Sequence, residues 1–265
     1  MVFIYIIYNL GFIKDNINNL EQKNISLQSN VDTFKLNLDS LQADLKNIKE
    51  ILDNIKSKYV NRPDLPSIIA KWRPFVVYIE CNFGSNYLSG SGFLTDSKSD
   101  NGIYVVTNKH ILIDNSGQSL TKCNFQLPGN NTIYSFELAF NFSENIDLGI
   151  LKVNSPDNYI KNLISSKTNN YMVCRKIATS VGDDIVILGY PVGGSQNDIT
   201  PTEGIISGYD GNYYITSAKM EHGNSGGVAI LVNQNCYVGM PTFVRVGDIE
   251  SYGRILNVDA IGIFN

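Results

Sequence analysis

The feature that most constrains this chain is an uninterrupted seven-residue repeat of apolar side chains in its N-terminal third. The repeat runs in alternating steps of three and four, and Asn24 is its only polar member. Such a repeat keeps one apolar seam of a helix turned toward a partner helix. We therefore expect residues 1–59 to form a long coiled-coil helix. The series is Phe3, Ile6, Leu10, Ile13, Ile17, Leu20, Asn24, Leu27, Val31, Phe34, Leu38, Leu41, Leu45, Ile48, Leu52, Ile55 and Tyr59.

Details of the repeat predict an oligomer. Asn24 occupies an "a" position, where a buried amide fixes register at some cost in stability. Leu at "a" with Ile at "d" in the pairs Leu45/Ile48 and Leu52/Ile55 favours assemblies larger than a dimer. We predict a homotrimer through residues 3–59. The alternative is a helix folded back on its own domain, which about 75 Å of helix over residues 10–59 would outreach.

The segment 2–13 (VFIYIIYNLGFI) is strongly apolar. It is shorter than the roughly 20 residues that a membrane-spanning helix needs. It also lacks the basic start and the small-residue cleavage site of a signal peptide. Contact with a membrane surface and burial against a partner helix both remain open for this segment.

Beyond the repeat, the apolar pattern changes to the period of two that is typical of strands. Prolines 63, 66 and 74 end the helical pattern, so we expect residues 60–74 to be a linker. Short apolar runs such as FVVYIECN, IYVVTN and DIVILGYP follow, separated by clusters of Gly, Asn, Asp, Ser and Pro. Many short strands without long helical patterns between them predict a mainly β domain over residues 75–265. Its length suits two six-stranded antiparallel β-barrels, at about 75–165 and 171–265.

Composition limits the chemistry that this domain can perform. A net charge of −4 gives no sign of nucleic-acid binding. The four cysteines, Cys81, Cys123, Cys174 and Cys236, are far apart in sequence, and the chain has only 2 histidines. We therefore expect no zinc site and no cofactor. We interpret the cysteines as buried thiols in a reducing compartment.

Three segments carry the residue types of a nucleophilic site, in the order His, Asp, Ser. His110 follows the run GIYVVTN, Asp147 precedes the run LGILKV, and Ser225 lies in EHGNSGGVAI. A serine hydroxyl needs a base within hydrogen-bond reach, and that base needs a carboxylate to fix its tautomer. Each residue alone reads equally well as an ordinary strand-end, turn or loop residue. Their order is that of the chymotrypsin triad.

Seven stretches in order across residues 75–262 resemble the chymotrypsin-fold serine proteases, most closely the HtrA/Deg branch. They are GSGFLTD, YVVTNKHIL, DLGILKV, VGDDIVILGYPVGG, TEGIISG, ITSAKMEHGNSGG and VGMPTF. The resemblance implies a serine endopeptidase in which His110 is the general base, Asp147 orients it and Ser225 is the nucleophile. It further implies an oxyanion hole formed by the N–H groups of Gly223 and Ser225. Thr242 falls where the family has a hydroxyl that hydrogen-bonds the aspartate.

The resemblance also suggests a substrate-binding edge. Thr242, Phe243 and Val244 resemble the segment that pairs with an extended peptide by β-addition. Val244 would narrow the primary pocket. Lys219 takes the position, six residues before the nucleophile, where trypsin-like enzymes carry an acid. We therefore expect a preference for small or medium apolar P1 side chains, and we interpret His222 as a loop or subsite residue.

Some features depart from the family pattern. Asn224 stands where zymogen-type enzymes carry the aspartate that pairs with a new N-terminus, so activation by that route is not expected. HtrA-like enzymes often carry a PDZ domain, and this chain stops too soon after the protease region for one. The usual final helix of the family is also in doubt. The alternatives to an active protease are a catalytically silent pseudoprotease or scaffold multimerised by the helix, and a membrane-tethered adaptor.

Overall fold

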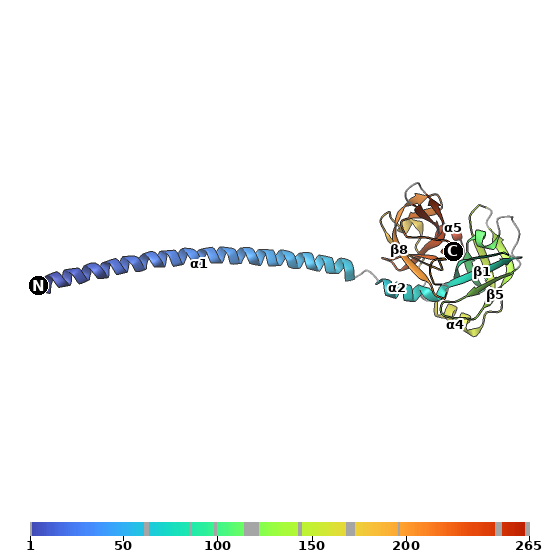
Figure 1. Ribbon diagram of the computed structural model, residues 1–265, viewed down its shortest axis with the longest axis horizontal. Helices are drawn as coiled ribbons and strands as arrows, with labels where there is room; N and C mark the ends of the chain where they lie inside the picture. Colours follow the sequence, from blue (N-terminus) through green and yellow to red (C-terminus); the bar gives the residue numbers. More distant parts are fainter. Residues whose placement is uncertain are drawn as a thin grey trace. The chain divides into compact units, whose positions relative to one another are not determined.

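The computed structural model describes residues 2–60, 64–84, 86–97, 100–113, 122–142, 145–167, 173–195, 197–246 and 251–262. The chain divides into two compact units, Met1–Asn61 and Arg62–Asn265, which are described separately (Figure 1).

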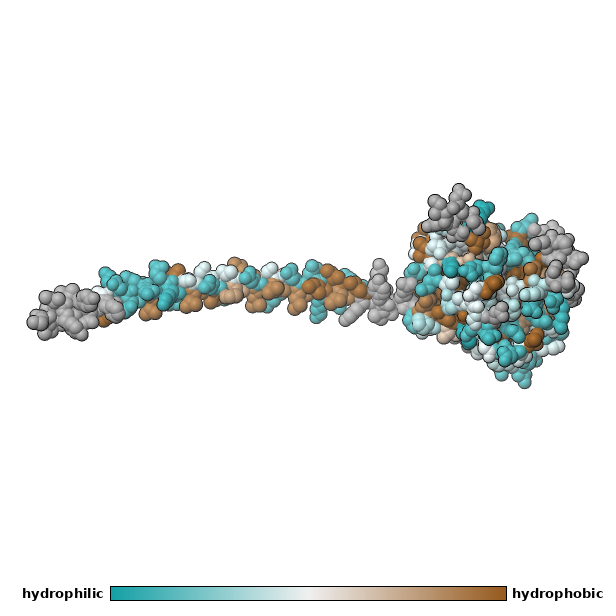
Figure 2. Space-filling view, viewed as in Figure 1, coloured by the Kyte–Doolittle hydropathy of each residue, from teal (hydrophilic) through white to brown (hydrophobic). Residues whose placement is uncertain are grey.

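The first unit is a single helix, α1 (Val2–Val60), and it confirms the predicted long N-terminal helix. The described apolar residues of the repeat are all exposed, from 44% at Val31 to 74% at Phe34. Figure 2 shows this apolar character along the helix. Most side chains of the apolar segment 2–13 lie outside those that the structure describes. No described helix is long and apolar enough to span a membrane. The predicted assembly of copies stays a prediction.

The second unit contains two closed six-stranded barrels, which confirms the predicted fold class (Figure 1). Neighbouring strands are antiparallel, in the orders β1-β2-β3-β6-β5-β4 and β10-β11-β12-β9-β8-β7. The first barrel comprises β1 (Val76–Phe83), β2 (Asn86–Asp96), β3 (Ile103–Thr107), β4 (Lys122–Gln126), β5 (Tyr134–Phe142) and β6 (Gly149–Val153). The second comprises β7 (Asp184–Gly189), β8 (Thr200–Asp210), β9 (Tyr213–Thr216), β10 (Val228–Leu231), β11 (Cys236–Val246) and β12 (Ser251–Asn257).

Short helices occupy the connections. They are α2 (Leu65–Trp72), η1 (Arg73–Phe75), α3 (Lys109–Leu112), α4 (Asn158–Lys167), η2 (Lys176–Ala178) and α5 (Val258–Ile261). Thus α2 and most of η1 lie inside the interval 60–74 that the prolines suggested as a linker. Pro66 sits in the first turn of α2, where a missing N–H costs nothing. Asp64 caps that helix by accepting from the N–H of Ser67 at 3.2 Å.

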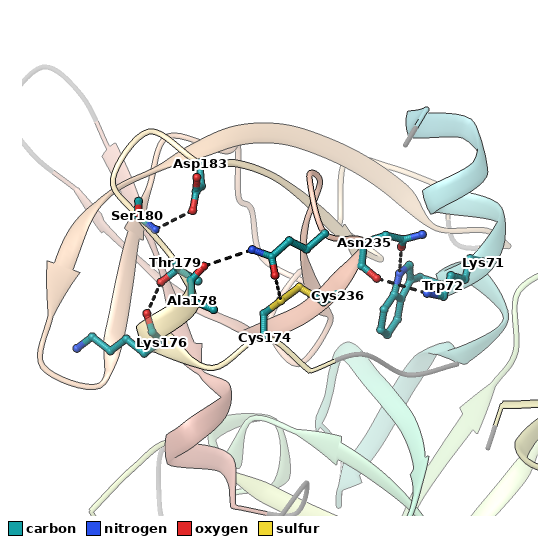
Figure 3. The surroundings of a disulfide bond; sticks show 11 residues. Lys71, Trp72, Cys174, Lys176, Ala178, Thr179, Ser180, Asp183, Asn235 and Cys236 are labelled. Atoms are coloured by element: carbon teal, nitrogen blue, oxygen red, sulfur yellow. Dashed lines mark hydrogen bonds between the residues drawn. A yellow bond between two sulfur atoms is a disulfide. The ribbon is translucent and has the colours of Figure 1, made fainter. Parts of the chain in front are cut away.

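A core between the two barrels holds them together. Trp72 of α2 is fully buried there and lies 6.1 Å, between ring centroids, from Phe93 of β2. Phe93 in turn stacks on Tyr237 of β11 at 4.9 Å. The indole N–H of Trp72 donates to the side-chain oxygen of Asn235 at 2.7 Å (Figure 3). Burial of three aromatic rings fixes the barrels against each other and against α2.

The cysteines form two disulfides, so the prediction of four free thiols is wrong. Cys81 and Cys123 face each other across β1 and β4, and Cys174 pairs with Cys236 at the start of β11 (Figure 3). The pairs are separated by 42 and 62 residues. Sequence spacing could not identify them, because the barrels bring distant segments together. The expected reducing compartment rested on free thiols, and the two disulfides remove that reason for it.

Candidate active site

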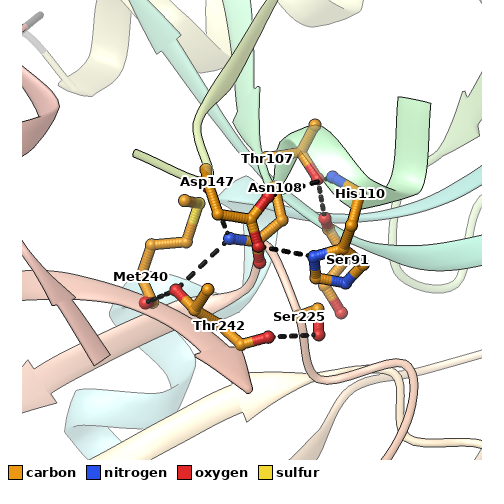
Figure 4. Close-up of polar contacts among 8 residues, drawn as sticks. All are labelled: Ser91, Thr107, Asn108, His110, Asp147, Ser225, Met240 and Thr242. Carbon is orange, nitrogen blue, oxygen red and sulfur yellow. Dashed lines mark hydrogen bonds and ion pairs between the residues drawn. The ribbon is translucent and has the colours of Figure 1, made fainter. Parts of the chain in front are cut away.

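Asp147 holds both the ring and the backbone of His110. One carboxylate oxygen lies 2.6 Å from His110 Nδ1, and the other accepts from the backbone N–H of His110 at 3.0 Å (Figure 4). His110 lies on α3, and Asp147 lies just before β6. A carboxylate can only accept, so the proton sits on Nδ1 and leaves Nε2 free to accept one. The side chains of His110 and Asp147 are 48% and 26% exposed, which leaves the imidazole open to solvent.

The loop that carries Ser225 requires glycine. Gly223 has a φ of 97°, and a Cβ there would collide with the carbonyl oxygen of Tyr190. Gly226 has a φ of 86°, and a Cβ there would collide with the carbonyl oxygen of Ser91. Both conformations strain any residue with a side chain. The two glycines therefore allow the loop to lie directly against β2 and the end of β7.

The N–H groups of this loop differ in whether they have a hydrogen-bond partner. The N–H groups of Asn224, Gly226 and Gly227 donate to the carbonyls of Glu221, Pro241 and Asn224, at 3.1, 2.9 and 3.0 Å. Within the described part of the chain, the N–H groups of Gly223 and Ser225 donate to no acceptor. Two unpaired donors two residues apart are the arrangement that binds a developing oxyanion. They are also the two donors that the sequence predicts.

The hydroxyl of Ser225 points toward β11 of its own barrel and not toward His110. It donates to the backbone carbonyl of Thr242 at 2.9 Å (Figure 4). No hydrogen bond joins Ser225 Oγ to His110 among the described residues. The structure therefore brings the predicted pair of His110 and Asp147 together, while the hydroxyl of the predicted nucleophile has another partner.

Thr242 does not make its expected bond. Its hydroxyl donates to the carbonyl of Met240 at 3.0 Å, and no described bond joins it to the carboxylate of Asp147. Asn108 stands between them instead. Its amide donates to the backbone carbonyl of Asp147 at 2.8 Å and to the hydroxyl of Thr242 at 3.3 Å (Figure 4). A chain of hydrogen bonds thus runs from His110 through Asp147, Asn108 and Thr242 to Ser225.

The predicted substrate-binding residues lie in two places. Thr242, Phe243 and Val244 are on β11, and Lys219 is in the connection between β9 and β10. Phe243 is 37% exposed and its ring meets that of Tyr213 edge-on, at 5.4 Å. Val244 pairs with Gly253 on β12 and is half-buried. The side chain of Lys219 is 78% exposed and lies 3.4 Å from Glu221, so it faces solvent. At Gly253 an added Cβ would collide with the Sδ of Met220, so the side chain of Met220 lies directly against this glycine.

His222 contributes its backbone to this region. The carbonyl of His222 accepts from the N–H of Val192 at 2.8 Å, and its side chain is exposed. This fits its interpretation as a loop residue. Tyr213 lies close enough to Asp147 for the carboxylate to act on it. Burial, and then the charge of Asp147, raise the pKa of the Tyr213 hydroxyl.

Sequence reasoning missed three polar residues of this site. Asn108 and Ser91 lie inside the stretches YVVTNKHIL and GSGFLTD, and Tyr213 opens the strand before Ser225. A polar residue inside an apolar strand pattern could have indicated them, because a buried polar side chain needs a hydrogen-bond partner. Asn108 and Ser91, both fully buried, follow this rule.

Comparisons with known proteins identify the family of this domain. A family model described as a trypsin-like peptidase domain matches residues 90–240. A serine protease HtrA-like protein of Staphylococcus aureus (strain bovine RF122 / ET3-1) is 29% identical over 157 residues, which are 53% of this chain and 18% of that protein. Its counterpart in strain USA300 matches with the same identity and coverage. The chain thus spans less than a fifth of the length of these relatives.

Solved structures resemble the fold. One described as the HtrA-type protease AlgW with tripeptide has a TM-score of 0.57 at 19% identity, over 75% of this chain and 61% of that one. The serine endoprotease from Yersinia pestis has a TM-score of 0.55 at 23% identity, over 75% and 64%. Since the family model covers more than half of the 265 residues, from 90 to 240, the chain belongs to the trypsin-like peptidase domain family.

Proposed function

We propose that this protein is a serine endopeptidase that hydrolyses peptide bonds through an acyl-enzyme. The observation that carries the proposal is the pair of hydrogen bonds that the Asp147 carboxylate accepts from the ring and the backbone of His110, at 2.6 and 3.0 Å. The bond from the ring fixes the imidazole tautomer that a general base requires. The unpaired N–H groups of Gly223 and Ser225 support the same assignment.

The proposed mechanism starts with rotation of the Ser225 hydroxyl from the Thr242 carbonyl toward His110. Ser225 Oγ then attacks the scissile carbonyl carbon as its proton moves to His110 Nε2. The N–H groups of Gly223 and Ser225 stabilise the oxyanion, each donor contributing roughly 3 kcal/mol to barrier lowering. His110 gives the proton to the departing amine nitrogen. A water molecule, deprotonated by His110, then hydrolyses the ester and regenerates Ser225.

The proposed specificity is for small or medium apolar P1 side chains. Lys219 faces solvent, and Val244 and Met220 surround Gly253 where β11 and β12 pair. Neither Val244 nor Met220 offers a carboxylate to a basic P1 side chain. Faster cleavage of Arg or Lys peptides than of Val, Ala or Leu peptides would contradict this part of the proposal.

The proposed assembly is a homotrimer formed by α1. The exposed seam of this helix would be buried if copies packed seam to seam, which is how a heptad repeat stabilises a coiled coil. The protease domains would then be tethered in one particle, and each would keep its own site.

A catalytically silent scaffold is the alternative function, and one observation favours it. The hydroxyl of Ser225 is engaged with the carbonyl of Thr242 at 2.9 Å and makes no described bond to His110. In a silent protein that bond would persist, and the triad residues would have only a structural role.

Active-site labelling distinguishes the two functions. A fluorophosphonate probe reacts with a serine only where the base and the oxyanion hole are competent. We expect the full-length protein to be labelled, and both Ser225→Ala and His110→Ala to remain unlabelled. Ser217→Ala, an exposed serine on the same barrel, is the matched control and keeps the label. Absence of Ser225-dependent labelling in the assembled protein would favour the scaffold.

A further inference from the structure

Ser91 is a fully buried residue of β2 that contacts the loop of Ser225 from the opposite barrel. Its hydroxyl donates to the carbonyl of Gly223 at 2.6 Å and accepts from the N–H of Tyr190 at 2.8 Å. Its own N–H donates to the carbonyl of Ser225 at 2.8 Å. Its carbonyl accepts from the hydroxyl of Thr107 at 2.7 Å. Every polar group of Ser91 is therefore used, and two of its bonds go to residues that carry the unpaired N–H groups.

The hydrogen bond from Ser91 to Gly223 matters because glycine has no side chain to restrict its backbone conformation. Gly223 can rotate about φ and ψ more freely than any other residue. The peptide before Gly223 is held because the carbonyl of His222 accepts from Val192 N–H at 2.8 Å. In a trans peptide the N–H points opposite to the carbonyl, so this bond turns the Gly223 N–H the other way. The peptide after Gly223 is held at its carbonyl by the hydroxyl of Ser91, at 2.6 Å, and at its N–H by the longer bond from Asn224 to the carbonyl of Glu221, at 3.1 Å.

We propose that Ser91 is a positioning residue for the oxyanion hole, acting through the carbonyl of Gly223. The inference rests on the proposed protease function and adds a residue from the first barrel to a loop of the second. With the hydroxyl removed, the Gly223 carbonyl and the Tyr190 N–H lose their partner in a buried place. The peptide planes around Gly223 then turn to find other partners, and the Gly223 N–H leaves its orientation.

Ser91→Ala tests this inference in the full-length protein. We expect kcat on a peptide substrate to fall at least about tenfold, toward the roughly 10²–10³-fold cost of losing one oxyanion donor. We expect KM to stay within about twofold, because an oxyanion donor acts in the transition state. The affinity for a peptide boronate, whose tetrahedral adduct places an oxygen in the hole, falls in parallel with kcat. Ser91→Cys keeps a weak donor at the same place and gives an intermediate kcat.

Thr179→Val is the matched control for the loss of a buried hydroxyl. The hydroxyl of Thr179 donates to the carbonyl of Lys176 at 2.8 Å, away from the site. The substitution Thr179→Val is expected to lower the melting temperature and to leave kcat unchanged. An unchanged kcat in Ser91→Ala, or an equal loss in Thr179→Val, would overturn the role of Ser91. If the unaltered protein cleaves no peptide, the proposed function fails. Crystal structures then decide the role of Ser91, since an unmoved His222–Gly223 peptide in Ser91→Ala also overturns it.

Discussion

The side-chain amide of Asn108 donates to the hydroxyl of Thr242, 3.3 Å away, and so joins the barrel that carries His110 to the barrel that carries Ser225. The second hydrogen of that amide goes to the carbonyl of Asp147 at 2.8 Å. Asn108 is fully buried, and its own oxygen has no partner among the described residues. A single amide therefore connects both halves of the candidate site.

Asn108→Ala is expected to lower the free energy of unfolding by about 2 kcal/mol, because it leaves the partly buried Asp147 carbonyl without a described partner and removes a buried bond to Thr242. It is also expected to slow fluorophosphonate labelling, since Asp147 and Thr242 lose their common contact. Urea unfolding and labelling rates measure the two effects. Asn158→Ala, an exposed residue of α4, is the control and stays within about 0.5 kcal/mol. Equal stability of the two variants would contradict the prediction.

Asp147→Asn is expected to slow labelling by about 10⁴-fold with little change in the fold. An amide in place of the carboxylate can donate to Nδ1 of His110 and so favour the tautomer with the proton on Nε2. That tautomer cannot accept the proton of Ser225. The rate constant of labelling, with circular dichroism as a check on folding, makes the measurement.

Asp183→Asn is the matched control for Asp147→Asn. Asp183 accepts from the N–H of Ser180 at 2.7 Å in a turn of the second barrel, and its replacement leaves the labelling rate unchanged. A rate for Asp147→Asn within tenfold of the unaltered protein would show that this carboxylate does not set the tautomer.

The pair Arg73–Asp198 is expected to contribute to stability against acid. The two groups form a bidentate ion pair at 2.7 and 2.8 Å, and the hydrogen bond from Arg73 lowers the pKa of Asp198. A lowered pKa means that the contribution is present above the unfolded value of about 3.9 and is lost as the pH falls through the folded value. The effect is small because the side chain of Asp198 is 44% exposed.

Urea unfolding as a function of pH tests this pair. Asp198→Asn is expected to be less stable than the unaltered protein near neutral pH, and the two curves converge as the pH falls through the lowered pKa of Asp198. Glu203→Gln, an exposed carboxylate on β8, is the control and stays within about 0.5 kcal/mol throughout. A difference that grows toward acid pH would reverse the predicted sign.

Removal of either disulfide is expected to cost about 4 kcal/mol of unfolding free energy. The separations of 42 and 62 residues differ by only about 0.3 kcal/mol in loop-closure entropy, so the two losses are similar. The pairs Cys81→Ala with Cys123→Ala, and Cys174→Ala with Cys236→Ala, are compared by urea unfolding. Iodoacetamide alkylates the unaltered protein only after reduction and unfolding. Alkylation of the unfolded, unreduced protein would mean that the thiols are free.

Features that depend on the local sequence pattern could be predicted, and features that depend on contacts between distant segments could not. The barrel strands and the helix α1 follow from periodicity, which is a local property. His110, Asp147 and Ser225 could be chosen because each lies at the end of an apolar run. The disulfides and the packing of α2 through Ile68 and Trp72 could not be predicted, because both depend on contacts between distant segments. Prolines 63, 66 and 74 suggested a linker, yet Pro66 fits the first turn of α2 and Trp72 supplies a core residue.

The direction of the Ser225 hydroxyl lay outside any sequence argument for a different reason. This direction depends on the rotamer of one small side chain. The acceptor of its hydrogen bond is a backbone carbonyl, that of Thr242. Backbone carbonyls are present at every residue and leave no mark in the sequence. The bond that Thr242 makes to Met240 escaped prediction in the same way, since there too the acceptor is a carbonyl.

The apolar seam of α1 is expected to hold the oligomer together. Leu38 and Leu45 lie one heptad apart at "a" positions and are 55% and 70% exposed on the isolated helix. Replacing both by Lys places two charges in each copy of the seam, where burial without a partner is very costly. Sedimentation should then show a monomer with an intact protease domain. Ser40→Lys with Asn47→Lys has the same spacing and added charge on the opposite face, and it should keep the oligomer. If the Leu38 and Leu45 variant sediments like the unaltered protein, the seam is not the assembly surface, and the exposed face of α1 has another partner.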